Sequence, residues 1–554
     1  MSVNAITGRS AFLALLKDEG VTHLFGNPGT TELPIMDALR EHQDLNYVLG
    51  LQESVVVYMA DGYARASGEL VSCNVHVAPG LGNAIGAIYG AQFANVPMIV
   101  TAGQQEQGHG LTEPLLYAPL VPIAEPVVKW ATEINRLEDL PRVMHRAAKV
   151  AMAEPKGPVF ISLPGDILND EGGIDLGHST RVEQENRPSD AVLEKLADRL
   201  LKAERPVIVS GDEIVSADAF DEVAQLAEAL GAPAWQQTVN SGAHFPSRHP
   251  AYMGSLNRDQ KWVRSVMAEH DLLVVVGADV LRMSVYSEVE PLPEGMAVVQ
   301  IGLRDWEMGK NFPTELAVQA HVRETLKALI PLLAERGGEA HADRAAARLK
   351  AVEGKNWTAK RKAAVERAAA KASQNPISGD YMMYQIAESL PDNAVVVNEG
   401  LTTANTLLQF LPFTDKNSYY ALTAGGIGWG IAAAVGAAAA KPDRPLVAII
   451  GDGSAMYSIQ ALWTAANRQL PITYVICNNM SYRIIKQRLK AFHGNEHFVG
   501  MDFDNPKLDF VGLANSMGMQ AKRITDPADI APAIKEATAS GKPMLLDVMV
   551  EKDV

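Results

Sequence analysis

LVAIIGDGS, at residues 446–454, is the stretch that decides the fold of this chain. Its apolar first half predicts a buried strand, and the glycines beside Asp452 predict a turn where the backbone can come close to a phosphate group. A second apolar run, Thr473 to Cys477, ends at the pair Asn478-Asn479, and Asn479 follows Asp452 by 27 residues. Because Mg²⁺ prefers a few protein oxygens together with phosphate oxygens, we expect Asp452, Asn479 and a backbone carbonyl at Ser481 to share one cation.

The composition is that of an acidic globular protein. The 554 residues are 47% hydrophobic and 21% charged, which predicts about three or four domains and a large core. The formal charge of −16 argues against a nucleic-acid partner, which would need a basic face. Cys73 and Cys477 both lie in apolar runs, so we expect no disulfide framework and a reducing compartment. No signal segment or spanning apolar run is visible, and we expect a cytoplasmic protein without a membrane partner.

Short β-branched runs alternate with alanine-rich helical patterns along the whole chain. This alternation predicts an α/β fold made of three domains with doubly wound parallel sheets. The expected strands of the first two domains are Val71 to Val75, Met98 to Thr101, Val159 to Leu163, Val207 to Ser210, Leu272 to Val276 and Val298 to Ile301. We divide the chain into a first domain at 1–180, a central domain at 181–340, a helical linker at 341–375 and a last domain at 376–554.

Three further motifs lie in the first domain: FGNPGT at 25–30, LGLQE at 49–53 and DGYAR at 61–65. Together with the GDG and Asn-Asn motifs they resemble the thiamin diphosphate-dependent decarboxylase and acetohydroxyacid synthase superfamily, and within it the benzoylformate decarboxylases. Other matches follow in the same order, at Gln104-Gln105, Arg248 to Pro250, Tyr419-Tyr420 and Ala424 to Gly428. The resemblance covers nearly the whole chain and implies a pyrimidine-binding first domain and a diphosphate-binding last domain.

The resemblance implies thiamin diphosphate and Mg²⁺ as cofactors. Glu53 would hydrogen-bond the aminopyrimidine ring and favour the imino tautomer that removes the thiazolium proton. The implied metal ligands are Asp452, Asn479 and Ser481. The implied cofactor-binding residues are Asn27, Pro28, Gly29, Thr402, Gly425, Ile427, Gly453, Ser454 and Tyr482. Leu401 stands where the relatives carry a hydroxyl, so a backbone amide would replace one phosphate contact. FAD in the central domain is compatible with the sequence but not expected.

Several residues expected to contact the substrate differ from those of the family that the chain resembles. Thr30 takes the place of a serine that binds the substrate carboxylate, and His76 matches the first of two proton-transferring histidines. Ser284 stands at the place of the second histidine, and His109 is either a substitute or a loop residue. The implied substrate pocket consists of Leu115, Leu116, Ile484, Ile485 and Arg488.

Arg488 replaces an aromatic residue and belongs to a basic cluster of Lys486, Arg488, Lys490, His493 and His497. This cluster is either a solvated helix face or an anion site for a second carboxylate, a phosphate or a coenzyme A tail.

The resemblance therefore implies a decarboxylase that forms a thiamin-bound enamine from a 2-oxo acid, with carboligation as a second outcome. The alternatives are an enzyme of the 2-hydroxyacyl-CoA lyase or oxalyl-CoA decarboxylase type, and an acetolactate synthase-like carboligase. A non-catalytic thiamin-fold protein is disfavoured because Glu53, Asp452 and Asn479 are all present. Active sites of this superfamily lie between subunits, so we expect at least a homodimer and, beyond it, a homotetramer.

Overall fold

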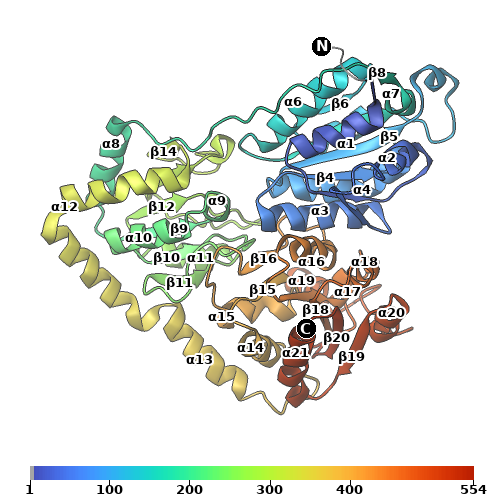
Figure 1. The fold of residues 1–554 in the computed structure, drawn as a ribbon. Helices are drawn as coiled ribbons and strands as arrows, with labels where there is room; N and C mark the ends of the chain where they lie inside the picture. The colour runs from blue at the N-terminus through green and yellow to red at the C-terminus, as the bar shows by residue number, and fades with distance from the viewer. Residues whose placement is uncertain (1–4) are drawn as a thin grey trace.

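Three six-stranded sheets, each entirely parallel, form the framework of the protein (Figure 1). The structure is a computed structural model and describes residues 5–554. Such sheets confirm the predicted α/β fold class, since parallel strands require helical crossovers that cover both faces.

The strands of each sheet are given in spatial order. The first sheet consists of β3 (Asn46–Leu49), β2 (His23–Gly26), β4 (Val71–Val75), β5 (Met98–Gln104), β7 (Pro158–Pro164) and β6 (Ala131–Glu133). The central sheet consists of β11 (Tyr252–Ser255), β10 (Ala234–Gln236), β9 (Pro206–Ser210), β12 (Leu272–Val276), β13 (Ala297–Gly302) and β14 (Leu316–Gln319). The third sheet consists of β16 (Tyr419–Ala421), β15 (Val395–Glu399), β17 (Leu446–Gly451), β18 (Ile472–Asn478), β20 (Met544–Met549) and β19 (Gln520–Ile524). A separate antiparallel pair joins β1 (Ile6–Thr7) to β8 (Glu171–Gly172).

Helices connect the strands of each sheet. Around the first sheet lie α1 (Gly8–Asp18), α2 (Leu33–Ala38), α3 (Glu53–Ser67), α4 (Val77–Phe93), α5 (Leu120–Ala124), α6 (Leu140–Met152) and α7 (Gly165–Asn169). The central part contains α8 (Asp190–Leu201), α9 (Glu213–Ser216), α10 (Phe220–Leu230) and α11 (Gln260–Met267). The third part contains α14 (Gly379–Ser389), α15 (Leu407–Phe410), α16 (Trp429–Ala440), α17 (Asp452–Ala455), α18 (Ala461–Asn467), α19 (Arg483–His493), α20 (Phe510–Ser516) and α21 (Ile530–Ala539).

The first and third sheets share one apolar core, which runs through the contact between α3 and α16. Two glycines allow these helices to touch: a Cβ added at Gly62 would lie 2.1 Å from the Ala433 carbonyl oxygen, and one at Gly436 only 1.8 Å from that of Met59. Later on α3, Arg65 stacks on Trp429 at the start of α16, with 4.6 Å between its guanidinium carbon and the ring centroid. The two helices therefore run antiparallel.

The connection between the central and third sheets differs from the predicted helical linker at 341–375. α12 (Val322–Val352) begins earlier, because its first turns bury Val322, Leu326 and Leu329 in the central core. Gly338 kinks this helix, and α13 (Trp357–Ala369) follows as a separate element. Residues 173–189, on both sides of the predicted boundary between the first and central domains, contain no helix or strand. The domain ranges given above remain predictions.

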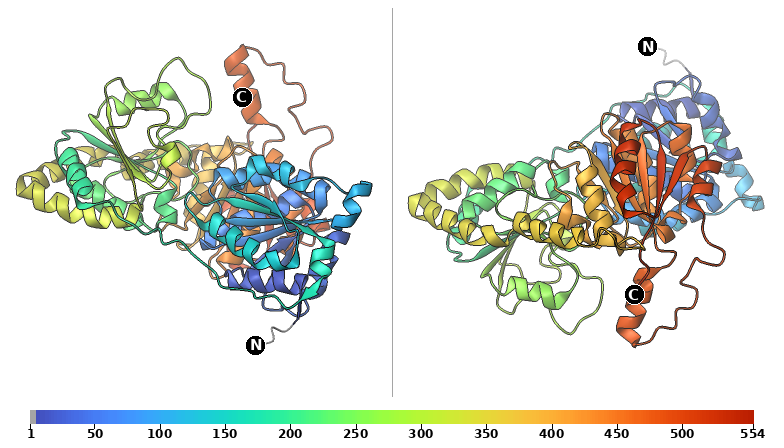
Figure 2. Two further views of the ribbon diagram at one scale, coloured as in Figure 1. Left: turned by 90° about the horizontal axis from the view of Figure 1, so that it is seen from above. Right: turned by 90° about the horizontal axis from the view of Figure 1, so that it is seen from below.

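α19 and the segment after it project from the body of the molecule beside the C-terminus (Figure 2). Arg483 Nε donates to the Asp553 carbonyl, and Lys552 pairs with Asp504, so the chain end lies along this projection. Within residues 5–554, no helix has both the length and the apolar character needed to cross a membrane. Cys73 and Cys477 are free and buried.

Candidate active site

The carboxyl edge of the first sheet brings together the FGNPGT turn and His76. The turn follows β2, and His76 lies directly after β4, the neighbouring strand. Gly29 makes this proximity feasible, because a Cβ there would lie 2.0 Å from His76 Nδ1. Thr30 is exposed at the same edge and lines a cavity of about 510 Å³ together with Gln104 and Gln105. Asn27 and Pro28 occupy the turn that leads to these residues.

Glu32 orients His76, a role that motif matching missed. Its fully buried carboxylate accepts from the backbone N–H of Gly29 and of Gly103, each at 2.9 Å, and from Thr31 Oγ1 at 2.8 Å. Glu32 Oε2 lies 2.7 Å from His76 Nδ1. Nδ1 is therefore engaged, and Nε2 has no hydrogen-bond partner among the described residues. Gly29 has no side chain to form a capping box with Glu32, so the sequence carried no signal for this carboxylate.

Glu53 begins α3 and lies on the same side of the first sheet. Glu53 is 8% exposed, and its Oε2 atom accepts a hydrogen bond from Asn83 Nδ2 at 3.0 Å. A Cβ added at Gly80 would lie 3.0 Å from Glu53 Oε1, so α4 passes close to this carboxylate. Asn83 itself is exposed on α4. Glu53 thus lies where α3 and α4 both begin, beside His76.

The GDGS turn and the Asn-Asn turn meet at the carboxyl edge of the third sheet. Burial raises the pKa of Asp452 to about 6, and the backbone amides of Gly453, Met480, Ser481 and Asn479 offset part of that rise. Asp452 Oδ1 accepts from the Gly453 N–H at 2.7 Å, whereas Asp452 Oδ2 is buried without a partner. A cation at this position would compensate the carboxylate charge.

The second turn is held by its own side chains. Asn479 Oδ1 accepts from the Ser481 N–H and hydroxyl, both at 3.0 Å, and Met480 between them has a φ of +56°. Tyr482 packs against Gly453, where an added Cβ would lie 2.5 Å from the ring. No group of three or more His, Cys, Asp or Glu residues among residues 5–554 could hold a metal ion. A cation between Asp452 and Asn479 would therefore need oxygens from a bound phosphate.

Two more segments of the third part border this edge. Thr402 is half-buried after β15, and Leu401 beside it has a φ of +45°. The loop before α16 exposes Gly425 and half-buries Ile427. Ser454 Oγ is buried and makes no hydrogen bond of ordinary geometry within residues 5–554, although it faces the Glu399 carboxylate. The edge therefore offers a buried hydroxyl and an unpaired carboxylate oxygen.

The predicted substrate-pocket residues come from two exposed segments. Leu115 is 88% exposed and Leu116 has a φ of +81°, both on the loop after β5. Ile484, Ile485 and Arg488 lie on the projecting helix α19. Ser284 is exposed in the loop after β12, and His109, also exposed, bonds through Nδ1 to Thr112 Oγ1 at 3.1 Å.

The basic cluster is partly neutralised. Lys486 pairs with Asp502 at 2.5 Å, and Lys490 with Glu496 at 2.7 Å. Arg488 has no ion-pair partner among the described residues. Burial, and then the nearby Arg488, lower the pKa of Arg258 in the central part. Among the Lys and Arg side chains of the cluster, Arg488 is thus the one that remains available to an anion.

Glu53 and His76 make no hydrogen bond or ion pair, within residues 5–554, to the predicted site residues of the third sheet. On α3, Arg65 stacks on Trp429, and the Tyr58 hydroxyl lies 3.5 Å from where a Cβ added at Gly426 would be. Glu53 lies five residues before Tyr58, which is about 7.5 Å along a helix axis. The described contacts of one chain therefore leave two half-sites that are not joined.

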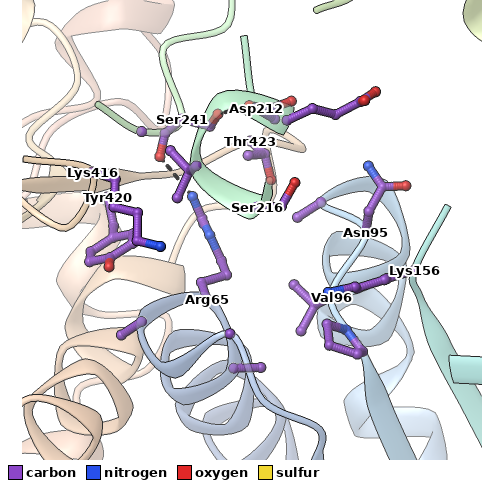
Figure 3. A pocket seen from close by; sticks show the side chains of 18 of the residues that line it. Arg65, Asn95, Val96, Lys156, Asp212, Ser216, Ser241, Lys416, Tyr420 and Thr423 are labelled. Carbon is purple, nitrogen blue, oxygen red and sulfur yellow. Dashed lines mark hydrogen bonds between the residues drawn. The ribbon is translucent and has the colours of Figure 1, made fainter. Parts of the chain in front are cut away.

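A second cavity, of about 250 Å³, lies where the three parts of the chain meet (Figure 3). Arg65 reaches from α3 into this junction and donates to the carbonyl oxygens of Ser241 at 2.7 Å and Ala421 at 3.0 Å. None of the predicted site residues lines the cavity. Arg65 thereby ties the three sheets together at a distance from the half-sites.

Comparison with known proteins assigns these half-sites to a family. Residues 6–114, 193–329 and 402–548 match the N-terminal TPP binding domain, the central domain and the C-terminal TPP binding domain of thiamine pyrophosphate enzymes. Benzoylformate decarboxylase from Pseudomonas aeruginosa is 32% identical over 98% of this chain and 98% of its own length. The chain belongs to the thiamine pyrophosphate enzyme family.

Other members of the family are similar over the same length. Acetolactate synthase isozyme 1 large subunit from Escherichia coli is 27% identical, covering 99% of this chain and 94% of its own. The structure of the thiamine diphosphate-dependent 4-hydroxybenzoylformate decarboxylase from Rhodococcus jostii RHA1 has a TM-score of 0.87 and 30% identity, covering 99% of this chain and 100% of its own. The chain is a thiamin diphosphate-dependent enzyme. The unpaired Asp452 oxygen fits a cation, and the buried Ser454 hydroxyl fits the diphosphate that such a cation would bind.

Proposed function

We propose that the protein catalyses the non-oxidative decarboxylation of a 2-oxo acid, as a benzoylformate decarboxylase-like enzyme that requires thiamin diphosphate and Mg²⁺. The observation that carries this proposal is the buried Glu32 carboxylate on His76 Nδ1, at 2.7 Å, which leaves Nε2 without a partner among the described residues, at the sheet edge that also carries Thr30. Such an imidazole can deliver or accept a proton next to a bound substrate. The similarity to two benzoylformate-type decarboxylases supports the same substrate class.

The third sheet would hold the cofactor. Asp452, Asn479 and the carbonyl at Ser481 would bind Mg²⁺, whose remaining ligands would be diphosphate oxygens. The diphosphate would contact Thr402, Gly453, Ser454 and Tyr482, and the loop residues Gly425 and Ile427 would contact its rings. The first-sheet residues Asn27, Pro28 and Gly29 would close the site from the other side.

The bound cofactor supplies an electron sink for the carbanion left when CO₂ departs. The protein contributes proton placement and substrate orientation. Glu53 would hold a proton at the aminopyrimidine, Thr30 would donate its hydroxyl to the substrate carboxylate, and His76 Nε2 would exchange a proton at the product oxygen or carbon.

A second copy of the chain would complete each site. Glu53 and the third-sheet loops do not meet within one chain, and Asn83, the partner of Glu53, lies on a face of α4 that is open. This face contains Pro79, Gly82, Asn83, Gly86 and Tyr89, all exposed. We therefore propose at least a homodimer, with a homotetramer as the expected assembly. The two buried free cysteines are compatible with a reducing, cytoplasmic location.

A second candidate function is carbon–carbon bond cleavage in an acyl-CoA substrate, as in enzymes of the 2-hydroxyacyl-CoA lyase or oxalyl-CoA decarboxylase type. It is favoured by the unpaired Arg488 and by Ser284 at the place of a second histidine. Slow proton delivery at Ser284 would also favour capture by a second carbonyl compound, as in an acetolactate synthase-like carboligase.

The test is a panel of 2-oxo acids and acyl-CoA thioesters, assayed with thiamin diphosphate and Mg²⁺ and with products identified by mass spectrometry. We expect CO₂ and an aldehyde from an aromatic 2-oxo acid. Turnover of acyl-CoA thioesters alone would replace this proposal by the second candidate. If both substrate classes are turned over, Arg488→Ala should raise KM for anionic acyl-CoA substrates and leave KM for benzoylformate unchanged.

A further inference from the structure

Glu399 is a buried carboxylate that the mechanism above does not use. It ends β15, is 2% exposed, and takes part in no ion pair among residues 5–554. Burial raises its pKa to about 7, and the amides of Gly430 and Gly428 and the Ser454 hydroxyl offset part of the rise. Burying a carboxylate without a nearby cation costs free energy. Other contacts must therefore stabilise Glu399 in this position.

The two carboxylate oxygens of Glu399 cap the N-terminus of helix α16, although Glu399 itself belongs to β15. Glu399 Oε1 accepts from the Gly428 N–H at 2.6 Å, and Glu399 Oε2 from the Gly430 N–H at 2.5 Å. Gly428, the residue before the helix, has no side chain that could make these bonds. A Cβ added at Gly430 would lie 2.9 Å from Glu399 Cβ, so glycine is required for this approach.

The capped residues form the base of the loop that carries Gly425 and Ile427. Gly425 and Gly428 have φ values of +78° and +101°, and Gly425 and Gly426 are exposed. A loop with two left-handed glycines has little conformational preference of its own. Its shape therefore depends on what holds its base, namely Glu399 and the Ser458 hydroxyl, which donates to the Gly428 carbonyl.

We propose that Glu399 is a positioning residue whose carboxylate fixes the orientation of the loop 424–428 and thereby sets the affinity for the ring portion of thiamin diphosphate. The inference rests on the proposed contact of Gly425 and Ile427 with the cofactor rings. Both backbone hydrogen bonds of Glu399 run to the base of this loop, at Gly428 and Gly430. The GDGS turn, where the diphosphate would bind, meets Glu399 through the Ser454 hydroxyl, so we expect the larger effect on the rings.

Glu399→Gln tests this in the full-length, cofactor-free chain, because it keeps the shape but offers an amide N–H₂ to a backbone N–H. The dissociation constants of thiamin diphosphate and of inorganic pyrophosphate, each with Mg²⁺, are measured by calorimetry. We expect at least about tenfold weaker thiamin diphosphate binding, as for the loss of one hydrogen bond to a charged group, with a much smaller change in pyrophosphate binding. Amide hydrogen exchange of residues 422–430 should become faster before any ligand is added.

Glu213→Gln is the matched control, since Glu213 is a buried carboxylate of the central part that accepts from the Leu303 N–H at 2.7 Å. It should leave both dissociation constants and the loop exchange unchanged. If Glu399→Gln does not fold, Gly430→Ala displaces the carboxylate instead and should give the same pattern.

Equal weakening of both ligands, or unchanged loop exchange with unchanged affinity, would overturn the proposal. No substrate is present in these measurements, so failure of the decarboxylase assignment would leave their outcome intact.

Discussion

Buried carboxylates organise both half-sites, and backbone amides hold them where a lysine or arginine would be expected. Glu32, Glu399 and Asp452 each accept from backbone N–H groups. None of the three pairs with Lys or Arg among residues 5–554. Their negative charge is therefore available to a protonated imidazole in the first case and to a metal ion in the last.

Asp452→Ala should abolish retention of thiamin diphosphate while the fold persists. The variant removes the carboxylate that would carry the cation, and the diphosphate charge then stays largely uncompensated. Calorimetry with Mg²⁺ and circular dichroism measure the two effects. Asp509→Ala removes an exposed carboxylate paired with Arg523 and serves as the control. Normal cofactor affinity in Asp452→Ala would rule out the metal assignment.

Glu32→Gln should lower kcat by about tenfold to a hundredfold with little change in KM, because it would remove part of the roughly hundredfold to ten-thousandfold that general acid–base catalysis contributes. The amide can no longer hold a proton on His76 Nδ1 as the carboxylate does, so the ring loses its fixed tautomer. The ¹⁵N chemical shifts of His76 report this change directly. An unchanged tautomer together with an unchanged kcat would remove Glu32 from the positioning role.

The sequence predicted the residues that belong to motifs and missed those that act through distant partners. Asp452, Asn479 and Ser481 lie together as their spacing predicted, since they end neighbouring strands. Glu32 meets the backbone of Gly103, 71 residues away, and Glu399 meets that of Gly428, 29 residues away. Such contacts depend on which strands become neighbours, and one sequence does not specify this.

At the scale of elements, β-branched runs predicted strands to within a few residues. The run Leu446 to Ile450 is found as β17 (Leu446–Gly451), and Thr473 to Cys477 as β18 (Ile472–Asn478). α12 was missed in its first half because its apolar positions pack on the central sheet, and this packing outweighs local composition.

The hydrogen bonds of Glu399, which join β15 to α16, predict that the stability of the cofactor-free chain depends on pH. Glu399 has a raised pKa of about 7, against a usual 4.5, so the folded state keeps a proton that the unfolded state releases. Stability is therefore lost as the pH rises from about 4.5 to 7, by up to about 3 kcal/mol. The groups facing Glu399 are Tyr58 of α3 and Ser454, neither of them a cation.

Urea unfolding of the cofactor-free parent and of Glu399→Gln at pH 5 and pH 7.5 checks this. The variant should lose less stability over this interval. The pKa of Asp452 is also raised, and its titration lowers the stability of both proteins by the same amount. Equal losses in the two proteins would contradict the assignment of Glu399 as the titrating group.

At the scale of the whole molecule, the two half-sites are the reason for the proposed homodimer. The antiparallel packing of α3 on α16 leaves Glu53 and Gly425 unjoined in one chain, and the shared core of the first and third sheets makes a rearrangement within the chain costly. A second copy can supply the missing half without any such change. The open face of α4, next to Glu53, is where that copy would lie.

Gly86→Arg on this face should separate the copies without harming the chain. A Cβ at Gly86 has no atom within 4 Å, so the folded chain tolerates a side chain there, whereas a closely packed second copy does not. We expect smaller particles in analytical ultracentrifugation and a loss of decarboxylase activity of about a hundredfold or more, as expected when catalytic groups lose their mutual placement. Gly354→Arg, equally open but on the short turn after α12, should change neither. A fully active Gly86→Arg monomer would mean that one chain assembles its site alone.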